Sequence, residues 1–156
     1  MIINKIHWLG VGLSSPPGIL YLNEQRYDLL VWNRSVDKAQ SLLNNKIYVN
    51  QLDISSLSKK LDRNDLIVSM LPASMHMEIA ELAIKYKCHL VTSSYHDPQY
   101  EKLEQKFIDN DCLFICECGL DPGIDHLLAH KLIQEFEKEN YQDIKSIWFE
   151  SMCGGC

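Results

Sequence analysis

The sequence lacks a long apolar run, a surplus of basic residues and the pattern of a secretion signal. No segment reaches the roughly 18 apolar residues that a membrane helix needs, so we expect no membrane partner. The first residues do not place basic side chains before an apolar run, as a signal peptide does, which indicates a cytoplasmic protein. The net charge of −6 argues against a nucleic-acid partner, because nucleic acids select a basic protein face.

The sequence has 6 cysteines but no complete set of metal ligands. Cys112, Cys116 and Cys118 have the even spacing that places side chains on one face of a strand. Cys153 and Cys156 form a CxxC pair, and a structural zinc site needs further ligands. We therefore expect reduced, structural cysteines and no metal. A redox pair and half of a zinc site are the alternatives for Cys153 and Cys156.

Apolar runs alternate with segments of helical period along the 156 residues, which are enough for one domain. We expect strands at residues 5–9, 27–32, 46–49, 65–71, 89–92, 112–116 and 144–150, with helical segments between them. This alternation predicts an α/β fold with a Rossmann-type doubly wound parallel sheet. We expect residues 1–150 to form this domain. Residues 151–156 would then begin the connection to a substrate domain that is missing from this chain.

A glycine-rich turn, GVGLSSPPG, follows the first expected strand and predicts a site for the diphosphate of a dinucleotide. Gly10 allows the chain to turn tightly, and Gly12 leaves no side chain between the backbone and a diphosphate. The helix that follows presents unpaired N–H groups to phosphate. The other expected cofactor contacts in this turn are Leu13, Ser14 and Ser15. A structural turn without a ligand is the alternative.

Asn33 and Arg34 follow the second expected strand, where NAD-binding sites usually carry Asp or Glu. Asn lacks the carboxylate that would repel a 2′-phosphate, and Arg can pair with that phosphate through two N–H groups. These residues predict a preference for NADP, with NAD as the alternative cofactor. A surface Arg beside a neutral helix cap would explain them without a ligand. After the third strand, we expect Asp53 and Ile54 to meet the adenine ring.

Polar residues gather at the carboxyl ends of the later strands, where open parallel sheets bind ligands. The segment LPASMH follows the fourth strand, TSSYHDP includes the end of the fifth and GLDPGIDH follows the sixth. Together with the opening GVGLSSPPGILYL and the ending SMCGG, these segments resemble the saccharopine reductase family (saccharopine dehydrogenase, glutamate-forming). The resemblance spans nearly the whole chain. The sequence departs from the family pattern at Ser15, Pro16, Met152 and Cys156.

This resemblance implies an NADP-dependent oxidoreductase of lysine metabolism. Such an enzyme oxidises the secondary amine of saccharopine and releases glutamate and aminoadipate semialdehyde. The resemblance assigns Tyr95, Asp121 and Asp125 to catalysis and leaves open which aspartate faces the substrate. It places Cys153 near the same cleft. The remaining expected cofactor contacts are Leu71, Pro72 and Ser94.

Each of these side chains also has a purely structural interpretation. Tyr95 would bond to a neighbouring loop. Asp121 would cap the next helix, and Asp125 would stabilise the first turn of that helix through its dipole. For His76, a role as a local hydrogen-bond partner fits better than a role as general base. His126 and His130 fit one face of a helix better than a metal site.

The arginine content limits what this chain can do alone. A substrate with several carboxylates needs cations around it, and none of Arg26, Arg34 and Arg63 lies near the polar cluster in the sequence. We therefore expect this chain to bind NADP without turnover. An amino-acid substrate, and a homodimer as one option, would depend on the missing domain. The alternatives are a polyamine enzyme similar to carboxynorspermidine dehydrogenase and a non-catalytic NAD(P)-binding module.

Overall fold

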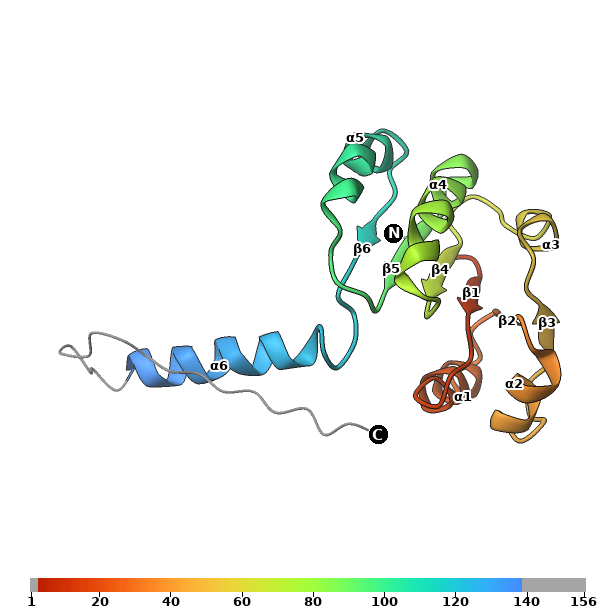
Figure 1. Cartoon of the computed structure of the whole chain (residues 1–156), viewed down its shortest axis with the longest axis horizontal. Helices are drawn as coiled ribbons and strands as arrows, with labels where there is room; N and C mark the ends of the chain where they lie inside the picture. Colours follow the sequence, from red (N-terminus) through yellow and green to blue (C-terminus); the bar gives the residue numbers. More distant parts are fainter. Residues whose placement is uncertain (1–2, 139–156) are drawn as a thin grey trace.

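The computed structural model describes residues 3–138, in which a layered α/β body carries one projecting helix (Figure 1). The strands are β1 (Ile6–Leu9), β2 (Leu29–Asn33), β3 (Val49–Gln51), β4 (Leu66–Ser69), β5 (His89–Thr92) and β6 (Phe114–Ile115). They form one parallel sheet in the order β3-β2-β1-β4-β5-β6. This order confirms the predicted Rossmann-type sheet, whose halves diverge between β1 and β4.

Helical segments connect successive strands at the places that the alternation predicts. They are α1 (Pro16–Glu24), α2 (Val36–Leu42), α3 (Ile54–Ser58), η1 (Ala73–Met75), α4 (His76–Tyr86), η2 (Pro98–Tyr100), α5 (Glu101–Asp109) and α6 (Ile124–Lys138). The position predicted for the third strand was wrong. Asn44 and Asn45 both adopt left-handed φ values, so the turn after α2 is longer and pairing with β2 begins only at Val49. The strand expected at 144–150 and the connection at 151–156 lie outside the described residues.

Alternating side chains fill a core on each face of the sheet. One face packs against α1 and α2 through Trp8, Ile19, Val31, Ala39, Leu43 and Val49. The other face packs against α3, α4 and α5 through Leu9, Leu57, Ile67, Ile79, Leu90, Leu103 and Phe107. Because both faces are covered, most strand side chains are apolar, as expected for a buried parallel sheet, although His7, His89 and Thr92 are buried within it.

A hydrogen-bonded histidine lies inside this sheet, near its amino-terminal edge. His7 Nε2 lies 3.1 Å from Asp65 Oδ2, and Trp32 Nε1 donates to His7 Nδ1 at 3.3 Å. Because the indole can only donate, Nδ1 must accept, and Nε2 carries the hydrogen that reaches Asp65. Asp65 also accepts from the backbone N–H groups of Lys5 and Asp62. This network satisfies polar groups that would otherwise be costly to bury.

Helix α6 stands apart from the two cores. It extends from the end of β6 away from the sheet (Figure 1), and none of its side chains is buried among the described residues. Its exposed apolar side chains include Ile124, Leu127, Leu128 and Leu132. No helix between residues 3 and 138 is both long enough and apolar enough to cross a membrane.

The buried histidines predict a loss of stability in mild acid. Burial lowers the pKa values of His7, His76 and His89, so the unfolded chain takes up protons more readily than the folded chain. The free energy of unfolding should therefore fall as pH drops below about 6.5, the ordinary histidine value. The slope can reach about 1.4 kcal/mol per pH unit for each histidine.

Urea denaturation at about pH 7.5 and about pH 5.5 measures this slope. Replacing His89 with Gln should flatten it, whereas His130→Gln on the exposed side of α6 should leave it unchanged. Equal stability at both pH values would contradict the prediction.

Candidate functional site

The loop after β1 requires a glycine at its first position. Gly10 has a φ of 92°, and a Cβ added there would lie 2.9 Å from the Met70 carbonyl oxygen. This approach joins the ends of β1 and β4, where the sheet halves diverge. Gly12 differs, because a Cβ added there would meet nothing within 4 Å. The backbone at Gly12 therefore faces open space, which a bound group could occupy.

Backbone N–H groups remain unpaired between this loop and α1. Among residues 3–138, the N–H groups of Leu13, Ser14 and Gly18 donate to no other residue. The Ser15 hydroxyl accepts from Gly12 N at 3.2 Å and lies 3.5 Å from the Gly10 carbonyl oxygen. Ser15 is thus buried and closes the loop, which explains a serine at this position. Unpaired N–H groups at a helix start favour an anion such as a diphosphate.

The end of β2 is tied to the glycine loop by an amide side chain. Asn33 Oδ1 accepts from Val11 N at 2.9 Å, and Asn33 Nδ2 donates to the Ser35 carbonyl oxygen at 2.9 Å. Arg34 follows and is exposed, with its carbonyl oxygen accepting from Gln51 Nε2. Its guanidinium forms no hydrogen bond or ion pair with another residue in the range 3–138. The structure therefore brings an available cation beside the loop.

Asp53 and Ile54 lie at the start of α3 and already make structural contacts. Asp53 Oδ1 accepts from Ser56 N at 2.8 Å, and the hydrogen bonds from Ser56 lower the pKa of Asp53. Ile54 is partly buried against the core beside α3. Their expected contact with an adenine ring stays a prediction.

The segments after β4 contribute a buried side chain and two candidate contacts. Leu71 is partly buried against the core, and Pro72 is exposed. His76 begins α4 and is fully buried, which lowers its pKa and keeps the ring neutral near pH 7. Because His76 does not reach the surface, a general-base role has no support in the geometry.

A hollow of about 540 Å³ lies at the carboxyl ends of β5 and β6. Its lining includes Ser94, Tyr95, Asp97, Asp121 and Pro122. The Tyr95 hydroxyl donates to Asp121 Oδ1 at 2.7 Å, across 26 positions of sequence. The structure thus places Tyr95 and Asp121, two of the three predicted catalytic side chains, on one wall with Ser94 beside them.

Asp125 is placed differently from Asp121. Asp125 Oδ1 accepts from Gly123 N at 2.7 Å, and Asp125 Oδ2 lies 3.6 Å from His126 Nε2. Gly123 has a φ of 144°, and a Cβ there would overlap the Gly119 carbonyl, so this turn requires glycine. Asp125 therefore supports the turn that precedes α6, whereas Asp121 lines the hollow.

Glu117 belongs to the same site, although the sequence pattern assigns it no role. Its Oε1 accepts from His96 N at 3.1 Å, and its Oε2 lies 3.9 Å from His126 Nδ1. These contacts connect Glu117 to residues that lie 21 and 9 positions away along the chain. A pattern of residue types cannot report such pairing, because it depends on the meeting of β5 and β6.

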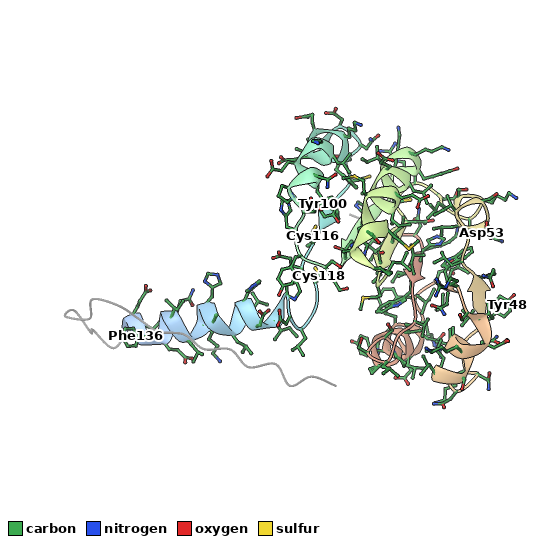
Figure 2. The ribbon with its side chains drawn as sticks, viewed as in Figure 1. Tyr48, Asp53, Tyr100, Cys116, Cys118 and Phe136 are labelled. Carbon is green, nitrogen blue, oxygen red and sulfur yellow. The ribbon has the colours of Figure 1, made fainter. Side chains whose placement is uncertain are left out.

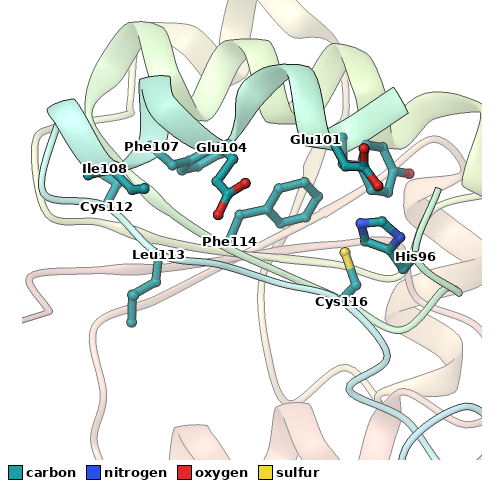
Figure 3. Close-up of a pocket in the computed structure, with 10 residues that line it drawn as sticks. His96, Glu101, Glu104, Phe107, Ile108, Cys112, Leu113, Phe114 and Cys116 are labelled. Carbon is teal, nitrogen blue, oxygen red and sulfur yellow. The ribbon is translucent and has the colours of Figure 1, made fainter. Parts of the chain in front are cut away.

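A second hollow, of about 380 Å³, lies under α5 along the exposed edge of β6. Figure 3 shows Glu104 reaching from α5 toward Phe114, with His96 and Cys116 at one end. Cys116 and Cys118 lie where the chain leaves β6 for α6 (Figure 2). Burial raises the pKa values of both thiols, so they stay protonated near pH 7.

The cysteines that the structure describes, Cys88, Cys112, Cys116 and Cys118, are all free thiols. Within residues 3–138, no group of three Cys, His, Asp or Glu side chains is arranged to hold a metal ion. Cys153 and Cys156 lie outside the described residues.

Comparison with known proteins gives the same fold and a consistent family. Residues 6–115 match the family described as "Saccharopine dehydrogenase NADP binding domain". Saccharopine dehydrogenase [NADP(+), L-glutamate-forming] of Schizosaccharomyces pombe is 35% identical, over 94% of this chain and 33% of the relative. Mitochondrial alpha-aminoadipic semialdehyde synthase of Mus musculus is 30% identical, over 97% of this chain and 17% of the relative.

Among solved structures, the apo saccharopine dehydrogenase (L-Glu forming) of Saccharomyces cerevisiae superposes with a TM-score of 0.73 and 34% identity. That match covers 86% of this chain and 32% of the other chain. A homoserine dehydrogenase of S. aureus, with 21% identity and a TM-score of 0.55, shares the fold. The chain spans about a third of the length of the saccharopine dehydrogenases that it matches.

The two loop glycines should respond differently to an added methyl group. Gly10→Ala should lower the free energy of unfolding by about 2 kcal/mol or more, because the Cβ meets the Met70 carbonyl and the positive φ disfavours alanine. Gly12→Ala should stay within about 0.5 kcal/mol of wild type. Urea denaturation of both variants tests this difference, and equal effects would contradict the described loop.

Proposed function

Since this chain belongs to the saccharopine dehydrogenase family, of which it contains the NADP-binding domain, we propose that it binds NADP(H) for an oxidoreductase acting on the secondary amine C–N bond of saccharopine. The products of that reaction are glutamate and aminoadipate semialdehyde, two compounds of lysine metabolism. The observation that carries the proposal is the open backbone at Gly12 beside the unpaired N–H groups of Leu13 and Ser14.

In this proposal the diphosphate lies on the loop from Gly10 to Ser15. Gly12 supplies space, and the N–H groups of Leu13, Ser14 and Gly18 supply donors and the positive end of the α1 dipole. Pro16 and Pro17 occupy the first helical positions, so the donors come from the loop and from Gly18. No carboxylate interrupts this stretch, which suits an anionic ligand.

Arg34 is the proposed partner of the 2′-phosphate that distinguishes NADP from NAD. The side chain is exposed, follows the end of β2 and has no protein partner in the described part of the chain. A guanidinium can bind a phosphate through two parallel N–H groups. Asn33 holds the adjoining backbone through its bonds to Val11 and Ser35. Leu71 and Pro72 are proposed to border the cofactor after β4.

The hollow beside Ser94 is the proposed position of the reacting part of the substrate. When bound, the nicotinamide supplies the hydride acceptor. The chain itself supplies Tyr95 and Asp121, whose oxygens can accept hydrogen bonds from a protonated amine. The bond between Tyr95 and Asp121 fixes both side chains against the same wall. We assign the substrate contact to Asp121 in preference to Asp125, because Asp125 serves the Gly123 turn.

The whole enzyme's turnover depends on more residues than this chain contains. The relatives are about three times as long as the matched region, and no arginine lines the hollow within residues 3–138. Substrate carboxylates would therefore be held by a second domain, which residues 151–156 would lead into. The cytoplasmic location and a homodimer stay predictions from the sequence.

Cofactor binding and its dependence on Arg34 give the direct test. NADPH should raise the melting temperature of the 156-residue chain, because a ligand of the native state stabilises it. Arg34→Gln should weaken NADPH binding by about 10- to 100-fold through loss of a charge-assisted bond, and it should leave NADH binding unchanged. Isothermal titration measures both affinities.

Arg63→Gln is the matched control, because Arg63 lies before β4, at the amino-terminal ends of the strands and away from the proposed cofactor site. A chain that NADPH does not stabilise would refute the cofactor proposal. Equal losses for NADPH and NADH would refute the role of Arg34.

Turnover tests the substrate. The chain alone should not reduce NADP+ with saccharopine, whereas a chain extended to the length of its relatives should do so, followed by NADPH absorbance. In the extended chain, Asp121→Asn should lower kcat/KM by about 10- to 100-fold, through loss of a charge-assisted hydrogen bond to the substrate amine. Asp125→Asn should act mainly on stability. Turnover of carboxynorspermidine in place of saccharopine would refute the proposed substrate.

A further inference from the structure

Glu117 has a backbone conformation that its own side chain does not favour. It follows β6 with a φ of 61°, in the left-handed region. Glycine, asparagine and aspartate adopt this region more readily than a longer side chain does. A glutamate in this conformation must be held there by its surroundings, and such positions concentrate at functional sites.

The contacts of Glu117 lie on both sides of Tyr95. The backbone N–H of Glu117 donates to the Ser94 carbonyl oxygen at 3.1 Å. Its carboxylate Oε1 accepts from the His96 N–H at 3.1 Å. One residue therefore bonds to the main chain immediately before and immediately after Tyr95. The side chain of Glu117 is about one-third exposed, at 35%, so the contact forms near the surface rather than in the core.

The segment around Tyr95 is a loop, which the Tyr95–Asp121 bond, the turn at Asp97 and the contact between the His96 and Tyr100 rings also support. Residues 95–97 belong to no helix or strand, and the Tyr95 side chain is 60% exposed. Exposed loops with few backbone bonds sample several conformations. The bond from the Tyr95 hydroxyl to Asp121 requires the loop to stay in one of them.

We propose that Glu117 is a positioning residue that holds the main chain of Ser94 and His96, so that Tyr95 meets Asp121 on the wall of the hollow. This inference rests on the proposed function for its meaning, because it concerns the side of the site assigned to the substrate. Glu117 itself need not touch the substrate, since its Oε1 is directed to His96 N and its Oε2 lies 3.9 Å from His126 Nδ1.

Two substitutions separate the carboxylate contact from the backbone strain. Glu117→Gly removes the carboxylate and accepts the left-handed φ, so the chain should fold as well as wild type. Glu117→Gln keeps the side-chain length and the oxygen that accepts from His96 N, and it removes the negative charge. Asp121→Ala provides the reference state in which the Tyr95 hydroxyl has lost its hydrogen bond to Asp121.

Amide hydrogen exchange and the ring resonances of Tyr95, measured by NMR on the 156-residue chain, give the readout. In Glu117→Gly, the His96 amide should exchange at least about 10-fold faster, and the Tyr95 ring shifts should move toward those of Asp121→Ala. Glu117→Gln should resemble wild type. Glu81→Gln, on the exposed face of α4, should change neither signal.

Unchanged His96 exchange and unchanged Tyr95 shifts in a folded Glu117→Gly chain would overturn the inference. A Glu117→Gln chain that behaves like Glu117→Gly would overturn it too, because the charge rather than the bond to His96 would then matter. NADPH titration keeps this result separate from the proposed function. Glu117→Gly should bind NADPH like wild type, whereas a failure of the wild-type chain to bind would refute only the cofactor proposal.

Discussion

The path of the chain out of β1 is the constraint on which the site depends. Gly10 passes so close to the Met70 carbonyl that any side chain would push the ends of β1 and β4 apart. Because β1 pairs with β2 and β4, displacing it would disturb the sheet at its centre. The same chain path brings the loop to Asn33, whose Oδ1 accepts a hydrogen bond from the Val11 N–H. The close contact between Gly10 and Met70 thus brings the unpaired N–H groups, the Asn33 side chain and the exposed Arg34 together at one edge of the sheet.

Much of this arrangement could be predicted from the sequence, since alternation of strands and helices determines a doubly wound sheet and fixes where loops emerge. The chain order of strands also predicts which loops share the ligand-binding edge. The third strand was misplaced because two consecutive asparagines, Asn44 and Asn45, lengthen a turn by left-handed conformations that apolar periodicity does not report. β6 is shorter than the apolar run CLFIC suggests, because only Phe114 and Ile115 pair with β5.

Side-chain partners were harder to predict than positions. The sequence brought Tyr95, Asp121 and Asp125 forward through a family resemblance, but their different roles depend on distances across the fold. Asp121 reaches Tyr95, whereas Asp125 reaches a glycine two residues before it. The role of the Glu117 carboxylate could not be predicted for the same reason, because its bond to His96 joins segments that only the folded chain brings together. Family membership accounts for a cofactor domain, and local geometry separates the residues that line the hollow from those that maintain its shape.

Asn33 has a consequence for how cofactor preference can change. Its oxygen faces an N–H group while its nitrogen faces the Ser35 carbonyl oxygen, each at 2.9 Å. An aspartate here would supply the carboxylate typical of NAD sites, but it would also set an oxygen against that carbonyl, with no hydrogen between them. A lineage moving from one dinucleotide to the other could not exchange this single side chain without rebuilding the β2–α2 turn. Redesign of the preference should therefore begin at Arg34, whose side chain forms no hydrogen bond or ion pair with another residue in the range 3–138.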